Sequence, residues 1–312
     1  MSNLLRKIKR AAHMGHYMRE VMHGMQRIEY CMRHDDMVEK ALNCNVPGIT
    51  TDRLCGHEVI VSLTTYGKRL LDVSPTIESI MQGSMKPNRI VLWLDNGLEG
   101  SPLPIALQRQ CERGLEIAFC KDLRSYKKLI PALCKFPEAV VITIDDDAIY
   151  NYDLVEKLVN AHKLYPHDIV ANRVHRMVLG KDGCPIPYME WNWCVNPPLE
   201  ESSPLLFFTG VGGVLYPPGS FNSAVTDEAV FMEICKSADD VWFNSMALMA
   251  GTKVRKCYTH DVKGEDYILN EDVQDVGLLH INISKAGGND RQLKAVYDKY
   301  GLWNKLTESK EA

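Results

Sequence analysis

Three adjacent carboxylates, Asp145, Asp146 and Asp147, directly follow the apolar run 139–144. Neighbouring acids repel one another, so three of them at the end of an apolar strand are costly unless a cation compensates their charge. Divalent ions such as Mg²⁺ and Mn²⁺ take oxygen ligands and often use one or two carboxylates together with phosphate oxygens of a substrate. The triplet therefore predicts a site for a metal-bound diphosphate. The alternative is a solvated acidic turn that caps the following helix.

A second acidic pair, Asp239 and Asp240, precedes the mostly apolar segment 241–246. A carboxylate can act as a general base toward a hydroxyl group, and a positioned base contributes about 10²- to 10⁴-fold to a rate. An acid is also favoured at the first turn of a helix, where the helix dipole stabilises it. The pair is therefore a candidate general base, with Asp239 as a plain helix cap as the structural alternative.

Other candidate residues lie between and around the two acidic sites. The glycine-rich run 209–219 contains Gly213, and glycine permits close approach of a sugar or diphosphate to the backbone, although a tight bend would need it too. Trp191 and Trp193 could stack on a sugar ring or pack in the core. Lys128 is a candidate diphosphate contact, and a plain surface lysine is the alternative.

These residues must be positioned by the elements that follow residue 58, where β-branched runs alternate with helical stretches. Strands are predicted at 59–63, 89–94, 115–119 and 139–144, and helices at 74–81, 104–113, 126–135 and 153–164. Such alternation is typical of an α/β protein with a parallel, doubly wound sheet, in which ligands bind beyond the carboxyl ends of the strands. No GxGxxG or GxxxxGK[ST] loop is present, which argues against dehydrogenases and P-loop enzymes.

The composition fits a globular enzyme. The chain has 312 residues, 46% of them hydrophobic and 24% charged, which argues against disordered, collagen-like and membrane-embedded classes. A formal net charge of −4 provides no basic field for nucleic acid. Ten cysteines without a CxxC pair indicate reduced thiols. With no apolar run of membrane-spanning length and no secretory signal pattern, we expect a cytoplasmic protein.

The first 34 residues differ from the rest, because they hold seven basic and two acidic side chains. Apolar residues recur there at spacings of three, four and seven, which predicts a helix. Three interpretations are open for this helix: peripheral contact with an anionic membrane on its cytoplasmic face, packing on the catalytic body, or pairing in a coiled coil. Residues 45–52 are predicted to be a linker, so the domains are 1–50, a helical extension with its linker, and 51–312, the catalytic body.

Several of these segments resemble a known family. The segment 62–69 (SLTTYGKR), the strand that ends in the triplet of aspartates, and 238–242 (ADDVW) are similar to the GT-A nucleotide-sugar glycosyltransferases, close to family 2, over roughly residues 58–290. The segment 212–218 (GGVLYPP) resembles related bacterial enzymes of polysaccharide synthesis. The resemblance implies a GT-A fold: a Rossmann-like, doubly wound, mostly parallel sheet, here with an N-terminal helical extension.

The resemblance also implies roles for individual residues. Asp240 would be the general base, with Asp239 as the second choice, Asp147 the metal ligand, and His280 a further ligand near the C-terminus. Asp145 would contact the donor or the metal, and Asp146 could serve either purpose. Thr64, Thr65, Tyr66 and Asp95 would hold the nucleoside. Arg69, Lys128 and Gly213 are further candidate donor contacts beside those that the resemblance implies.

The activity implied is an inverting glycosyl transfer that depends on Mn²⁺ or Mg²⁺. A hexosyl or N-acetylhexosaminyl group would move from a nucleoside-diphosphate donor, with UDP as the first choice, to a hydroxyl of a glycan or lipid-linked acceptor. Two other readings stay open. One is a metal-dependent nucleotidyltransferase, and the other is a non-catalytic carbohydrate-binding or scaffold protein that keeps a transferase fold.

Overall fold

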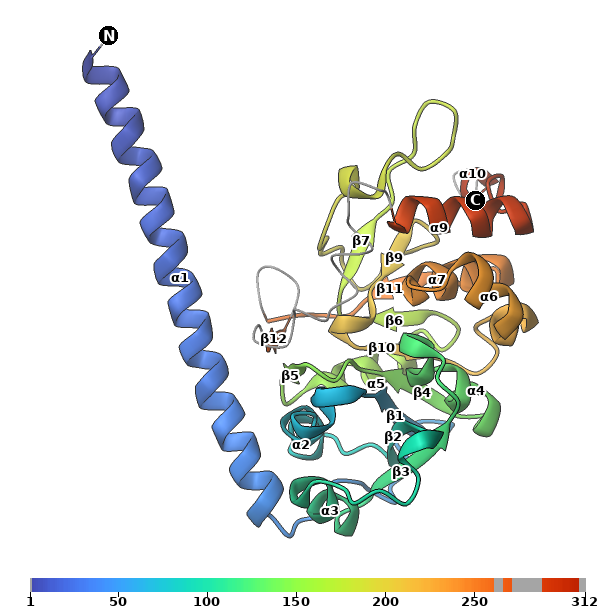
Figure 1. Ribbon diagram of the computed structural model, residues 1–312. Helices are drawn as coiled ribbons and strands as arrows, with labels where there is room; N and C mark the ends of the chain where they lie inside the picture. The colour runs from blue at the N-terminus through green and yellow to red at the C-terminus, as the bar shows by residue number, and fades with distance from the viewer. Residues whose placement is uncertain (1, 261–265, 271–287, 309–312) are drawn as a thin grey trace.

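A central sheet of eight strands organises the computed structural model, which describes residues 2–260, 266–270 and 288–308 (Figure 1). The strand order is β3-β2-β1-β4-β10-β6-β11-β8. The strands of this sheet are β1 Val59–Thr64, β2 Arg89–Asp95, β3 Leu115–Cys120, β4 Val140–Thr143, β6 Ile169–Ala171, β8 Ser202–Ser203, β10 Val214–Tyr216 and β11 Val254–Lys256. Two small sheets pair β5 Ala148–Tyr150 with β12 Tyr267–Leu269, and β7 Val174–Arg176 with β9 Leu206–Phe208.

The helices join these strands and cover both faces of the sheet. They are α1 Ser2–Asn43, α2 Ser74–Met81, α3 Ile105–Glu112, α4 Ile130–Lys135, α5 Leu154–Leu164, α6 Glu228–Ile234, α7 Asp239–Ala250, α9 Gly288–Tyr300 and α10 Lys305–Glu308. The helix predicted at 126–135 is instead a 3₁₀ turn, Arg124–Lys128, followed by α4. Pro131 has no N–H to donate to the preceding turn, so α-helical hydrogen bonding restarts at this point.

The topology confirms the predicted α/β class. Strands β1 to β4 are all parallel neighbours in the order β3-β2-β1-β4, and only β10 and β8 of the main sheet run against the other strands. Side chains of α2, α3 and α5 pack on one face, and those of α4, α6, α7 and α9 pack on the other. The sheet is therefore doubly wound and mostly parallel, as the alternation of strands and helices predicted.

The central strands are buried on both faces because successive side chains of a strand point to opposite sides. Ile60 and Val141 belong to the apolar cluster under α4 and α7, whereas Val61 and Ile142 belong to the cluster under α2 and α5. In the observed register, Val59 to Ser62 of β1 lie opposite Val140 to Thr143 of β4. That register places the ends of both strands at the same edge of the sheet.

The N-terminal helix α1 leans on the body only through its C-terminal part, and its N-terminal end stands away from the sheet (Figure 1). The chain that follows α1 is tied to the body by Arg113, whose Nε donates to the Val46 carbonyl over 2.8 Å. The guanidinium also makes two 2.9 Å hydrogen bonds to Glu78, which is fully buried in α2. No helix in the described part of the chain has the length and apolar character needed to cross a bilayer.

We expect Glu78→Ala to lower the free energy of unfolding by about 3–5 kcal/mol, because it leaves Arg113 buried without its carboxylate partner. The measurement is urea unfolding followed by circular dichroism. Arg109 and Glu112 form an exposed pair on α3, so Arg109→Ala is the matched control and should change stability little. Equal unfolding midpoints for wild type and Glu78→Ala would show that the buried pair does not anchor this region.

Candidate active site

Three parallel strands end side by side and bring polar side chains to one edge of the sheet. Thr64 ends β1, Asp95 ends β2, and Asp145 follows β4. The Thr64 hydroxyl donates to the Trp93 carbonyl over 2.9 Å, and Asp95 accepts the Gly97 N–H over 2.8 Å. Because ligands bind beyond the carboxyl ends of such strands, this edge is the candidate site.

Arg69 holds two carboxylates of the aspartate triplet. Its Nη1 lies 2.8 Å from Asp146 Oδ1, and its Nη2 lies 3.2 Å from Asp147 Oδ2. The other oxygen of Asp146 accepts the Thr65 hydroxyl over 2.6 Å. Burial raises the pKa of Asp146, and Arg69 and Thr65 oppose that rise. Both oxygens of Asp146 thus contact polar side chains of the segment that follows β1.

Lys128 joins the triplet to the second acidic pair. Its Nζ lies 2.8 Å from Asp145 Oδ1 and 3.1 Å from Asp239 Oδ2, and its side chain is buried. Burial alone would lower the pKa of Lys128, but attraction to Asp145, Asp239 and Asp240 outweighs it and raises that pKa well above the usual value. The lysine is therefore charged, and it neutralises acids from two distant parts of the sequence.

Asp240 lies at the first turn of α7 and faces the same cation. Its Oδ1 accepts the Gly210 N–H over 3.0 Å. Burial raises the pKa of Asp240 to about 7, the like charge of Asp239 adds to the rise, and Lys128 opposes it. One turn further on, Asn244 exchanges hydrogen bonds with both backbone polar groups of Phe208 and so fixes α7 against β9. A carboxyl with such a pKa can take up a proton near neutral pH.

Glycine allows the closest approach in this site at Gly210, which the sequence reasoning did not single out. A Cβ atom there would lie 2.5 Å from Lys128 Nζ and 3.3 Å from Asp240 Oδ1. Gly213, directly before β10, is needed for its backbone conformation, because it has φ +88°. A Cβ atom there would also lie 3.1 Å from the Leu154 side chain. Both glycines belong to the predicted glycine-rich run. The sequence did not show that Gly210, and not Gly213, faces the acids.

Gly210→Ala should lower the rate of the reaction at this site without unfolding the protein, because the added methyl group displaces the Lys128 ammonium from its carboxylates. Rates and unfolding midpoints are to be measured together. Gly56→Ala is the control, since a Cβ at that exposed position meets no atom within 4 Å. Wild-type rates for Gly210→Ala would show that the packing of Lys128 against this backbone does not matter for the reaction.

Tyr150 is a second residue that the sequence reasoning missed. It ends β5, and its hydroxyl accepts the Asp145 N–H over 3.0 Å and donates to the Val211 carbonyl over 2.8 Å. The side chain is buried, which raises its pKa well above the usual value and keeps the phenol protonated. Tyr150 thus links the aspartate triplet to the glycine-rich run. Its place shortly after the triplet was the only available signal.

The aromatic candidates lie in two environments. Trp191 is 5% exposed and packs against Tyr188 and Phe207, while Trp193 is half-buried and stacks on His175 with ring centroids 4.7 Å apart. These rings form a cluster beside β7 and β9. Tyr66, in contrast, is 50% exposed at the end of β1, and the Arg69 guanidinium lies 5.7 Å from its ring centroid.

The donor set for a metal ion consists of carboxylate oxygens, the ligands that Mg²⁺ and Mn²⁺ prefer. Asp145 and Asp147 supply such oxygens directly after β4, and phosphate oxygens of a substrate would complete the site, so the chemistry of the donor set fits the group. Within residues 2–260, 266–270 and 288–308, no three or more His, Cys, Asp or Glu side chains converge as a ready-made metal site. His280, the further ligand predicted from the sequence, lies outside the described residues.

Comparisons with known proteins found likeness only among solved structures. No family model and no curated protein sequence matches the chain. One similar structure is a CMP:2-keto-3-deoxy-manno-octonic acid synthetase complexed with CTP, 14% identical, with a TM-score of 0.37, covering 64% of this chain and 88% of that one.

Two further structures are of similar likeness. S. aureus TarS 1-349 in complex with UDP is 14% identical with a TM-score of 0.38, and the match covers 65% of this chain and 58% of that one. The inositol-1-phosphate CTP transferase from T. maritima is 8% identical with a TM-score of 0.38, covering 74% of this chain and 98% of that one.

Proposed function

We propose that the chain is a glycosyltransferase that moves a sugar from a nucleoside-diphosphate donor to a hydroxyl of a glycan or lipid-linked acceptor. One observation carries the proposal: Lys128 contacts both Asp145 at the end of β4 and Asp239 at the start of α7. A strand-end acid suited to a donor thus lies beside an acidic pair suited to proton removal. A scaffold protein would have no need for both acids around one buried cation.

The donor would lie across the ends of β1, β2 and β4. In this proposal, Thr64, Tyr66 and Asp95 contact the nucleoside, and the exposed ring of Tyr66 offers a surface for stacking. Arg69 and Lys128 supply positive charge beside the diphosphate. Thr65 is buried and donates to Asp146, which favours a positioning role over direct contact with the donor. UDP is the first choice of nucleotide.

Asp145 and Asp147 would hold a Mn²⁺ or Mg²⁺ ion, with His280 as the predicted further ligand. When bound, the ion would offset negative charge on the nucleoside-diphosphate leaving group.

Asp240 would remove the proton from the acceptor. As the hydroxyl oxygen attacks the anomeric carbon, its proton passes to an Asp240 oxygen and the bond from that carbon to the diphosphate oxygen breaks. A single displacement of this kind inverts the anomeric configuration. The pKa of about 7 suits a base that must be ionised before the reaction and protonated after it. The cluster of Trp191 and Trp193 would border the acceptor.

The test is a binding screen with UDP, CDP, GDP, ADP and CTP, each with and without Mn²⁺, followed by product analysis. A true donor nucleotide should raise stability by about 2.7 kcal/mol at one hundred times its Kd. Asp145→Asn should weaken this effect, and Asp52→Asn, at an exposed position in the linker, should not. Release of pyrophosphate from a nucleoside triphosphate would instead identify a nucleotidyltransferase. Sugar binding without turnover would favour the scaffold reading.

A further inference from the structure

An exposed apolar stripe runs along α1. Every residue from 13 to 29 is exposed. Isolated helices are marginal in water, and most helices in proteins gain their stability by burying an apolar face. The stripe is 42% to 70% exposed at each of its six positions, Met14, Met18, Val21, Met25, Ile28 and Met32.

The spacing of the stripe is that of a two-stranded coiled coil. The intervals between its residues are four, three, four, three and four, the alternation of a and d positions in a heptad repeat. With Ala11 the pattern extends over residues 11–32, about 33 Å of helix. A repeat of 3.5 residues keeps the same seam facing a partner helix when the two helices wind around each other in a left-handed supercoil.

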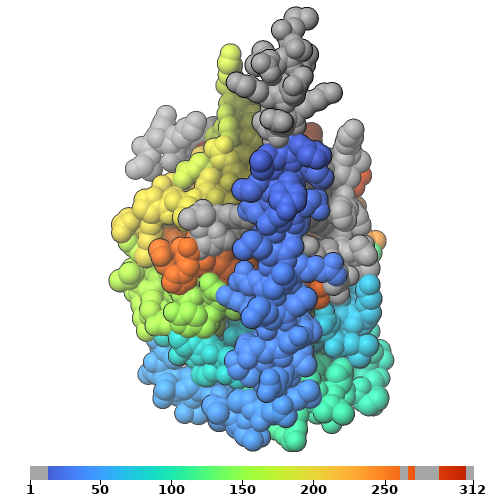
Figure 2. All heavy atoms as spheres, turned by 90° about the vertical axis from the view of Figure 1, so that its left-hand side faces the viewer, coloured from blue at the N-terminus to red at the C-terminus, as the bar shows by residue number. Residues whose placement is uncertain are grey.

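The catalytic body lies on the opposite side of α1. Arg33 donates to Asn151 over 3.1 Å, His34 lies 3.2 Å from Asp72, and Ala41 is fully buried. In the heptad these three residues take b and c positions, which face outward from a coiled coil. A second helix can therefore lie on the stripe without meeting the body of its own chain. Figure 2 looks onto this side of the molecule and shows α1 as its foremost element.

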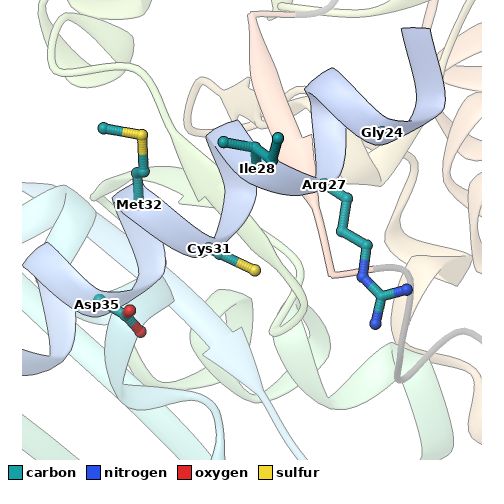
Figure 3. Close-up of a pocket in the computed structure, with 6 residues that line it drawn as sticks. All are labelled: Gly24, Arg27, Ile28, Cys31, Met32 and Asp35. Carbon is teal, nitrogen blue, oxygen red and sulfur yellow. The ribbon is translucent and has the colours of Figure 1, made fainter. Parts of the chain in front are cut away.

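A shallow hollow on α1 lies where the exposed stripe meets the neighbouring face of the helix. In Figure 3, Ile28 and Met32 project to the same side of the helix, and Arg27 points away from them. The hollow is lined only by residues of α1: Gly24, Arg27, Ile28, Cys31, Met32 and Asp35. It is an open depression, and two of its lining residues, Ile28 and Met32, belong to the stripe.

The charges favour a second copy of this chain over a membrane. Between residues 13 and 32 the formal charge is zero, because Arg19 and Arg27 balance Glu20 and Glu29. Four basic residues, Arg6, Lys7, Lys9 and Arg10, lie N-terminal to the stripe, but within residues 11–32 no excess of basic side chains is present to hold it on anionic lipid. Of the e and g positions that flank the seam from 15 to 31, Glu29 alone is charged. Two copies can meet there with little repulsion.

We propose that α1 pairs with α1 of a second copy of the chain and forms a two-stranded coiled coil through residues 11–32. The pairing buries six large side chains from each copy and supplies the burial that the projecting helix lacks. It also leaves the candidate active site of each copy outside the interface, because the body contacts the face of α1 opposite the stripe. The proposal is independent of the reaction that the body performs.

The test is the mass of the full-length protein in solution, measured by light scattering over a range of micromolar concentrations. We expect twice the chain mass of 35.3 kDa. Val21→Glu/Ile28→Glu places charges at two d positions and should yield monomer. His23→Glu/Gln26→Glu adds the same charges at f and b positions and should remain dimeric. A monomeric wild type, or a dimer that survives Val21→Glu/Ile28→Glu, would overturn the proposal.

A second variant guards against loss of α1 structure in the charged one. Replacing Met14, Met18, Met25 and Met32 by Leu keeps volume and improves seam packing, so the dimer should persist at protein concentrations at least tenfold lower. Tryptophan fluorescence should be equal in all variants, which shows that the body is folded, because all five tryptophans lie in the body. Sedimentation with phosphatidylglycerol vesicles tests the alternative that the stripe binds a membrane. A wild-type protein that is monomeric and binds these vesicles would support membrane binding and refute the pairing.

Discussion

Asp240→Asn is expected to reduce the rate of transfer by about 10²- to 10⁴-fold while leaving donor binding in place. The amide cannot take up the proton of the acceptor hydroxyl, yet its oxygen can still accept the Gly210 N–H that positions the side chain. Rate constants at saturating donor, with donor affinity from calorimetry, separate the two effects. A variant that transfers at the wild-type rate would remove Asp240 from the reaction.

The pH dependence gives a second readout of the same residue. A base with a pKa of about 7 must lose its proton before it can act, so the wild-type rate should rise as the pH is raised through 7. Repulsion by Asp239 helps to raise that pKa, so Asp239→Asn should move the rise to lower pH. A profile that does not move would show that the rise belongs to another group.

Stability should respond in the opposite direction. The pKa of Asp240 in the folded protein lies above the ordinary value of 3.8, so its contribution to stability is fully present below pH 4 and is lost as the pH rises through 7. Asn carries no such penalty. Above pH 7, Asp240→Asn should therefore unfold at a higher temperature than the wild type, whereas near pH 4 the two should differ little. A variant that is less stable than the wild type at pH 8 would contradict this account.

The strands and their direction could be predicted because their residues carry the signal locally. The run 139–144 is apolar except for Thr143, which is typical of strands covered on both faces, and the three acids after it mark where the strand leaves the core. The same reasoning predicted β1, β2 and β3. The helix predicted at 126–135 was wrong in its first half. The spacing of its side chains fits a helix, but it does not show that the missing N–H of Pro131 interrupts the backbone hydrogen bonds.

The meeting of the two acidic sites could not be predicted from the residues alone. Asp145 and Asp239 are brought together by the packing of α7 against β9, a contact between distant parts of the chain. A lysine is usually exposed, so nothing in the sequence indicated that Lys128 lies in the interior. Its place on the turn before α4, near the strand ends, buries it among acids. The resemblance to family 2 implied roles for Asp145 and Asp239, but it did not predict that Lys128 contacts both of them.

Replacing that cation should have the largest effect on the fold of the site. Lys128→Met leaves Asp145 and Asp239 without their shared partner, and loss of one side of a buried ion pair costs about 3–5 kcal/mol. We expect unfolding at a lower urea concentration and a transfer rate reduced at least as much as in Asp240→Asn. Lys121→Met, which removes an exposed lysine paired with Glu228, is the control for loss of a positive charge.

The pH profile separates the electrostatic role of Lys128 from simple destabilisation. Since its charge opposes the rise in the pKa of Asp240, Lys128→Met should move the remaining activity to higher pH. Lys128→Arg keeps the charge. The Lys128 Nζ packs closely on Gly210, since a Cβ atom there would lie only 2.5 Å from it, so the larger guanidinium does not fit and should rescue stability only in part. If Lys128→Met lost stability but kept the wild-type pH profile, the lysine would be a structural residue without influence on the base.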